Sequence, residues 1–139
     1  MAEKALTTTF AEPKNRGNGQ SGPISRGLSF AANTSSAKQY IIAPVTGNIV
    51  GIDIQGLVTS DATKTYTYVV TNKTTAKTVT AASQVMDADP VLTANTKASL
   101  ALSTTAANVA VTRGDLIEVD FTGGTGSGAT AVLVYFEEL

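Results

Sequence analysis

Short runs in which apolar and polar residues alternate with a period of two dominate this sequence. The clearest are GNIVGIDIQGL (residues 47–57), TYTYVVT (65–71), KASLALS (97–103) and LIEVDFT (116–122). Because successive side chains of a strand point to opposite faces of a sheet, each run predicts a half-buried strand. The runs are rich in Thr, Val and Ile, whose branched side chains suit a pleated surface.

The alternation also predicts which side chains share a face. In the run at 47–57, Val50, Ile52 and Ile54 fall on one face, and Ile49 falls on the other with Gly51, Asp53 and Gln55. The apolar sets of the other runs are Tyr66, Tyr68 and Val70; Ala98, Leu100 and Leu102; and Ile117, Val119 and Phe121. Tyr66 and Tyr68 are expected to face the core.

Turn signals rich in Gly, Pro, Asn and Asp separate these runs at a nearly regular spacing. About eight strands are expected, at roughly 27–32, 38–43, 48–57, 65–72, 76–81, 97–103, 108–112 with 115–122, and 129–136. This pattern predicts an all-β fold, an antiparallel β-sandwich or jelly roll of about eight strands with an extended N-terminal arm. Residues 81–86 are the only candidate for a helical turn.

Charge divides the chain into two parts. Residues 1–38 hold five basic and two acidic residues, and the remainder holds five basic and nine acidic ones, so the net charges are +3 and −4. We expect an extended or loop-like arm at 1–38 and a sandwich domain at 39–139. Phe10, Ile24, Leu28 and Phe30 are isolated apolar residues of the arm. They would either anchor the arm on a neighbouring surface or fold back onto their own core.

Composition narrows the chemistry of the chain. The sequence has no His, Cys or Trp, which removes the commonest general base, disulfides and thiolate metal sites. Glu118 and Asp120 share one strand face. Two carboxylates there could serve acid–base catalysis, but a role on a solvated outer face is the simpler interpretation. Asp61, Asp87 and Asp89 lack the spacing of a calcium loop. We therefore expect no enzyme, no catalytic residue, no metal and no cofactor.

Two motifs invite a functional interpretation. Arg113-Gly114-Asp115 matches a cell-adhesion tripeptide, but Gly114 stands where a tight turn between two strands requires a positive φ. The glycine-rich stretch 123–130 is followed by a strand and lacks the Lys of a phosphate-binding loop. The expected structure there is a hairpin loop.

The final strand, within ATAVLVYFEEL, is apolar on both faces. Leu133 and Tyr135 oppose Val132, Val134 and Phe136. Such a strand needs a cover on its outer face as well, either a loop of the same chain, the arm or another copy. We take this as the best indication in the sequence of a homo-oligomer, a dimer or trimer.

The stretch from Tyr40 to the C-terminus resembles the small jelly-roll modules of tailed bacteriophages. The likeness lies mainly in Ala43-Pro44-Val45-Thr46-Gly47 and in the turn from Gly114 to Val119. Such modules occur as head decoration (cement) proteins and as tips of phage fibres. A fibre tip follows a long shaft, whereas only a short arm precedes the body in this sequence.

The resemblance implies a non-enzymatic virion protein that clamps neighbouring subunits of the major capsid protein on the outer surface of the capsid. The alternative is a receptor- or glycan-binding fibre tip. The polar N-terminus carries no export signal, so synthesis in the host cytoplasm is expected, without membrane contact. The dispersed basic charges of the arm argue against nucleic acid as a partner. The residues expected to contact the capsid or a neighbouring copy are Phe10, Lys14, Arg16, Ile24, Arg26 and Leu28.

Overall fold

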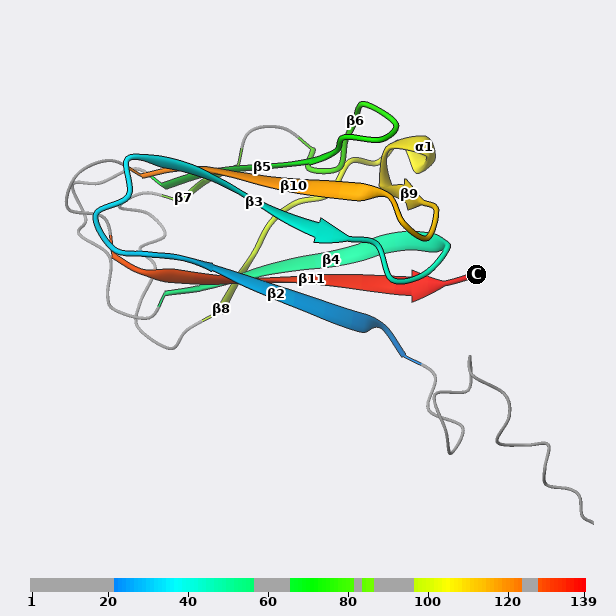
Figure 1. Ribbon diagram of the computed structural model, residues 1–139, viewed down its shortest axis with the longest axis horizontal. Helices are drawn as coiled ribbons and strands as arrows, with labels where there is room; N and C mark the ends of the chain where they lie inside the picture. The colour runs from blue at the N-terminus through cyan, green and yellow to red at the C-terminus, as the bar shows by residue number, and fades with distance from the viewer. Residues whose placement is uncertain (1–21, 57–65, 82–83, 87–96, 124–127) are drawn as a thin grey trace, which may run out of the picture.

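The computed structural model describes residues 22–56, 66–81, 84–86, 97–123 and 128–139. These residues form two antiparallel sheets that pack face to face (Figure 1). The elements are β2 (Ile24–Phe30), β3 (Ser36–Ile42), β4 (Gly47–Gly56), β5 (Tyr66–Asn72), β6 (Lys77–Thr78), β7 (Gln84–Met86), β8 (Lys97–Ser99), α1 (Ala106–Val109), β9 (Ala110–Val111), β10 (Leu116–Thr122) and β11 (Thr130–Glu138). No helix among the described residues is long and apolar enough to cross a membrane.

The strand order is that of a jelly roll. One sheet, called the β4–β11 sheet below, has the order β2-β11-β4-β8, and β9 also pairs with β4. The other, the β5–β10 sheet, has the order β3-β10-β5-β6, and β7 also pairs with β5. The chain therefore passes back and forth between the two layers, and the last two long strands, β10 and β11, occupy the middle of their sheets. The expected antiparallel sandwich is confirmed.

The core lies between the two sheets and is aromatic at one end. Phe121 of β10 packs on Phe30 with 4.9 Å between ring centroids, and on Tyr68 with 5.2 Å. Tyr66 and Tyr68 are buried, as their alternation predicts, and so are Ile117 and Val119. Such aromatic pairs add to the free energy of burial through edge and offset-stacked contacts.

The face assignment within β4 is wrong for two residues. Ile49 is 1% exposed and points into the core, whereas Val50 is 42% exposed. The cause is a β-bulge: Tyr135 of β11 pairs with Gly51, but the next residue, Phe136, pairs with Ile49. The extra residue, Val50, reverses the alternation on its N-terminal side.

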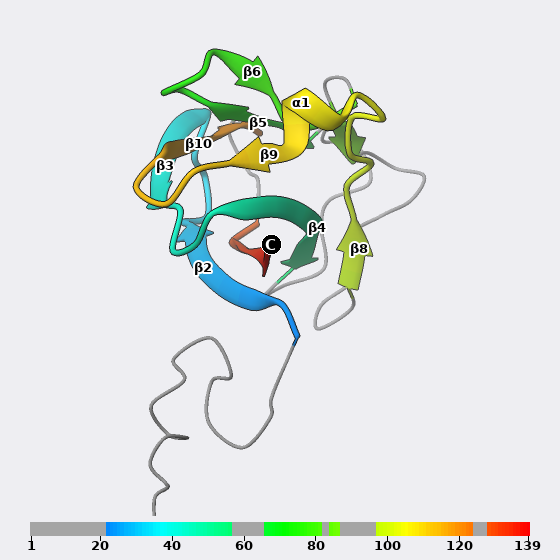
Figure 2. The ribbon, with the colours of Figure 1, turned by 90° about the vertical axis from the view of Figure 1, so that its right-hand side faces the viewer.

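The N-terminal part of the sandwich begins earlier than the expected boundary at residues 38/39. β2 pairs along its length with β11, from Ile24 opposite Phe136 to Phe30 opposite Thr130. Residues 24–38 therefore include a strand of the domain itself and the start of β3. Figure 2 looks at the end of the sandwich where β2 begins and the C-terminus lies. Residues 1–21 lie outside the described part of the chain.

The candidate helical turn at residues 81–86, of which 82–83 lie outside the described residues, is also wrong at its C-terminal half. Gln84–Met86 forms β7, which pairs with Tyr66–Tyr68 at the edge of the β5–β10 sheet. The short helix lies instead at Ala106–Val109, directly before β9. Residues 124–127 of the glycine-rich stretch lie outside the described residues. The strands before and after it, β10 and β11, belong to different sheets and do not form the expected hairpin.

Candidate functional site

The Arg113-Gly114-Asp115 motif is a turn that is tied to the body of the protein. Gly114 has φ of 97°, and the Asp115 amide donates to the Thr112 carbonyl at 2.9 Å, which closes a β-turn. The Gly114 amide donates to the carbonyl of Ala43. Gly114 thus has the positive φ that the sequence predicts, at a position where other residues are strained.

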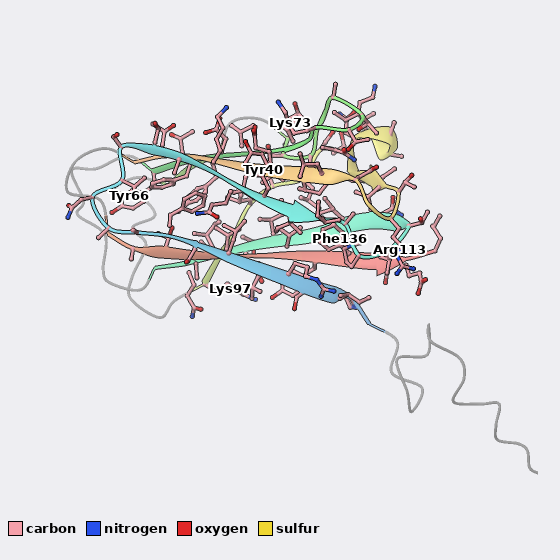
Figure 3. All side chains as sticks on the ribbon, viewed as in Figure 1. Tyr40, Tyr66, Lys73, Lys97, Arg113 and Phe136 are labelled. Carbon is pink, nitrogen blue, oxygen red and sulfur yellow. The ribbon has the colours of Figure 1, made fainter. Side chains whose placement is uncertain are left out.

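The carboxylate of this motif points inward. Asp115 is 6% exposed, and its Oδ2 accepts hydrogen bonds from the Thr112 amide at 2.9 Å and from Nδ2 of Asn72 at 2.8 Å. An adhesion ligand must offer this carboxylate to a receptor. Here it joins two loops of the domain, whereas Arg113 is exposed and lies at the end of the molecule (Figure 3).

The carboxylates of β10 lie on the outer face of the β5–β10 sheet. Glu118 accepts a hydrogen bond of 3.2 Å from the Tyr40 hydroxyl, and Lys38 lies 4.0 Å from Glu118 and 3.6 Å from Asp120. Glu118 is 6% exposed, so the expectation of a solvated outer face is wrong for this residue. Both carboxylates share the same ammonium group of the edge strand β3, which holds β3 against β10.

The outer face of the β4–β11 sheet is hollowed on two sides of one tyrosine. A hollow of about 350 Å³ is lined by Pro23, Val50, Gly51, Ile52, Asp53, Ser99, Leu100, Leu102 and Tyr135. A smaller one of about 90 Å³ is lined by Asp53, Gln55, Lys97, Ala131, Leu133 and Tyr135. Asp53 and Tyr135 line both hollows. We call this surface the Tyr135 groove.

Two glycines make room for the side chains of β11 on this face. A Cβ atom on Gly51 would lie 3.3 Å from Cδ2 of Tyr135, and one on Gly27 would lie 3.3 Å from Cδ2 of Leu133. Each glycine is directly opposite its partner across the strand pair. The half-buried ring of Tyr135 therefore packs over the backbone of β4.

Asp53 is the polar centre of the groove. Its carboxylate accepts a hydrogen bond of 2.7 Å from the Ser99 hydroxyl and lies 3.8 Å from Nζ of Lys97, and Tyr135 lines both hollows together with it. The neighbouring Asp53 carboxylate raises the pKa of Tyr135, because ionised Asp53 favours the protonated phenol. Figure 3 shows Lys97 on this outer side of the sandwich.

The residues expected to contact a capsid are distributed over two environments. Ile24 and Leu28 of β2 are half-buried and pack against the core of their own domain, which is the second of the two alternatives stated for them. Arg26, between them, is exposed and donates to the carbonyl of Ser25 at 3.0 Å. Phe10, Lys14 and Arg16 lie outside the described residues, as do Asp61, Asp87 and Asp89.

The Tyr135 groove is absent from the set of sites predicted from the sequence. The alternation did place Asp53 and Gln55 together on one face of β4, and Leu133 and Tyr135 together on one face of β11. Their meeting depends on the register between the two strands, in which Leu133 is opposite Asp53. The sequence signal that could have predicted the groove is a tyrosine and an aspartate on outward-facing positions of two long strands.

No group of three or more acidic side chains in the described ranges is arranged to hold a metal ion. Comparison of the chain with protein-family models, with curated proteins and with solved structures finds no match.

Proposed function

We propose that this chain is a non-enzymatic structural protein of a tailed-bacteriophage virion, which decorates the outside of the capsid and clamps neighbouring subunits of the major capsid protein. Two findings support the proposal. The strand order is that of a jelly roll, which is the fold that the resemblance implies. The carboxylates of Asp115 and Glu118 are occupied in holding turns and strands together.

The observation that carries the proposal is an apolar pair on an exposed sheet edge. Tyr40 is 52% exposed and Ile42 is 58% exposed. Both lie on β3, the edge strand of the β5–β10 sheet, and both face outward. An edge strand offers unpaired backbone groups to a partner strand, and neighbouring apolar side chains add contact area. Attachment to another protein through β3 accounts for both features.

Many weak contacts of this kind stabilise a shell. Each bound copy that spans two subunits adds a modest interface, and rupture of the shell must break many of these interfaces together. Because the protein binds only the assembled shell, it shifts the unfolding of the shell to a higher temperature by mass action.

The test is to add the purified protein to phage heads that lack it, prepared from a tailed phage that encodes this chain. We expect the added protein to co-sediment with these heads and to raise their melting temperature in scanning calorimetry. Ile42→Thr keeps a β-branched residue and should weaken binding about tenfold, as expected for loss of an apolar anchor. Val50→Thr, which changes an exposed apolar residue of the other sheet, is the control. Failure of the unmodified protein to co-sediment or to raise the melting temperature would contradict the proposal.

The alternative function is a receptor- or glycan-binding tip module of a phage fibre. The Tyr135 groove favours it, because the groove combines an aromatic ring with hydrogen-bonding side chains. Binding to host cells without any capsid would distinguish this function from decoration.

A further inference from the structure

We infer that the Tyr135 groove binds a neutral saccharide, with its apolar face against the ring of Tyr135 and its hydroxyl groups on Asp53 and the side chains beside it. The inference rests on the alternative function above, which it makes more specific, and does not depend on attachment to a capsid, which we assign to the opposite sheet.

The shape of the groove suits a small ring-shaped ligand. The larger hollow, of about 350 Å³, lies at the low end of the range for small-molecule sites, roughly 300–1,000 Å³. The smaller hollow continues it past Tyr135 and Asp53, which line both. A ligand longer than one sugar ring would therefore extend across Tyr135 from one hollow into the other.

Tyr135 provides the apolar platform. Its ring packs over Gly51, where a side chain would push it away from the sheet. A sugar ring presents C–H groups on its face, and these carry a weak positive charge that is attracted to the negative face of an aromatic ring. A platform fixed in advance reduces the entropy that binding must overcome.

Asp53 provides a fixed acceptor. Its carboxylate has about four lone-pair sites, and the Ser99 hydroxyl occupies one of them. A second partner, Lys97, is 3.8 Å away, and its side chain is 65% exposed. An exposed ion pair of this kind is weak, so Lys97 is free to turn toward a ligand. Asp53 then accepts from a sugar hydroxyl while Lys97 and Gln55 donate to neighbouring ones.

The charges of the groove select against other ligand classes. Asp53 and Lys97 together are neutral, and the carboxylate at the centre repels a phosphate or a carboxylate ligand. A second copy of the chain is a poorer occupant. Leu133 and Val50, the exposed apolar residues here, are 39% and 42% exposed, and Asp53 lies between them at the centre. The cores of stable protein interfaces are depleted of charged residues.

The test is an NMR titration of the full chain with free galactose, glucose, mannose, N-acetylglucosamine and N-acetylgalactosamine. We expect at least one of these sugars to shift the amide signals of Gly51, Asp53 and Tyr135, with little change on β3. Tyr135→Leu should weaken the binding of that sugar by about tenfold, because the aromatic platform for the sugar ring is lost. Asp53→Asn should weaken it to a similar extent.

Tyr40→Leu is the matched control, since it removes an exposed tyrosine from the other sheet. It should leave sugar affinity unchanged. The inference fails if none of the five sugars shifts these signals, or if Tyr40→Leu and Tyr135→Leu weaken binding equally. It also fails if light scattering shows that Tyr135→Leu dissociates an oligomer, because the groove is then an interface between copies. The titration of the unmodified chain decides the matter even if a variant does not fold.

Discussion

The side-chain amide of Asn72 donates a hydrogen bond of 2.8 Å to the carboxylate of Asp115, and both side chains are buried. On its other side, Oδ1 of Asn72 accepts from the amides of Thr74 and Thr75 at 3.0 and 3.2 Å. Asp115 in turn holds the amide of Thr112. One pair of side chains thus shapes the loop after β5 and the turn before β10, and fastens them to each other.

Replacement of Asp115 by Ala should therefore be costly. It leaves the Thr112 amide and the Asn72 amide group without their acceptor, and a buried unsatisfied group costs about 1–3 kcal/mol. We expect Asp115→Ala to lower the free energy of unfolding in urea by about 3 kcal/mol. Arg113→Ala changes an exposed residue of the same turn and should stay within about 0.5 kcal/mol of the unmodified protein. Equal effects of the two variants would contradict this role of Asp115.

Two turn positions with positive φ should respond in opposite directions to exchange between Gly and Ala. Gly114 has φ of 97° and Ala76 has φ of 59°. Because this region is strained for residues with a Cβ, Gly114→Ala should destabilise the protein by about 1–2 kcal/mol, and Ala76→Gly should stabilise it by up to about 1 kcal/mol. Thermal unfolding of both variants measures the difference. A stabilising effect of Gly114→Ala would contradict the φ assigned to this turn.

The strands could be predicted because the alternation of buried and exposed side chains along a strand appears directly as alternating apolar and polar residues in the sequence. Ile117, Val119 and Phe121 are fully buried on one face of β10, and their spacing of two reports that face without any knowledge of the neighbouring strands. Even Glu118, on the opposite face, fits the alternation. Its burial was missed because it results from Tyr40 and Lys38, which come from a strand far away in the sequence.

Features that depend on register could not be predicted. The bulge at Val50 exists only in relation to Tyr135 and Phe136 of β11, and nothing within β4 marks it. The same register brings Tyr135 over Gly51 and close to Asp53. The groove could therefore not be predicted from either strand alone. Β-sheet pairing between distant segments is set by the whole fold, whereas the alternation within a strand is local.

Tyr68 should make the protein sensitive to alkaline pH. Burial raises the pKa of Tyr68 from its ordinary value of 10.0 to about 12. Between these two pH values the unfolded chain ionises this phenol and the folded protein does not, so the free energy of unfolding falls as pH rises. Below pH 10 the phenol is protonated in both states, so no stability is lost. From pH 10 to pH 12 the free energy of unfolding falls by about 2–3 kcal/mol.

Comparison with Tyr68→Phe isolates this effect, because every other ionisable group is shared. At pH 8 the unmodified protein should be more stable by about 1 kcal/mol, since its hydroxyl donates to Thr130 at 3.0 Å. By pH 11 this advantage should be gone or reversed. Urea unfolding at both pH values measures it, and a constant difference between the two proteins would show that Tyr68 titrates alike in both states.

Deletion of residues 2–22 should separate folding from attachment. β2 begins at Ile24, and Ile24 and Leu28 pack on the core of their own domain, so the shortened chain keeps its strands. We expect strand-rich circular dichroism and cooperative unfolding.

The deleted residues include Phe10, Lys14 and Arg16, and under the proposed function they contribute an apolar anchor and positive charge to the contact with the capsid. Binding to heads should therefore become weaker and less sensitive to salt, because charge attraction that speeds encounter is screened by ions. Co-sedimentation at low and high salt measures both changes. Binding as tight as that of the full chain would exclude residues 2–22 as an attachment device and leave the exposed edge strand β3 to hold the protein on the shell.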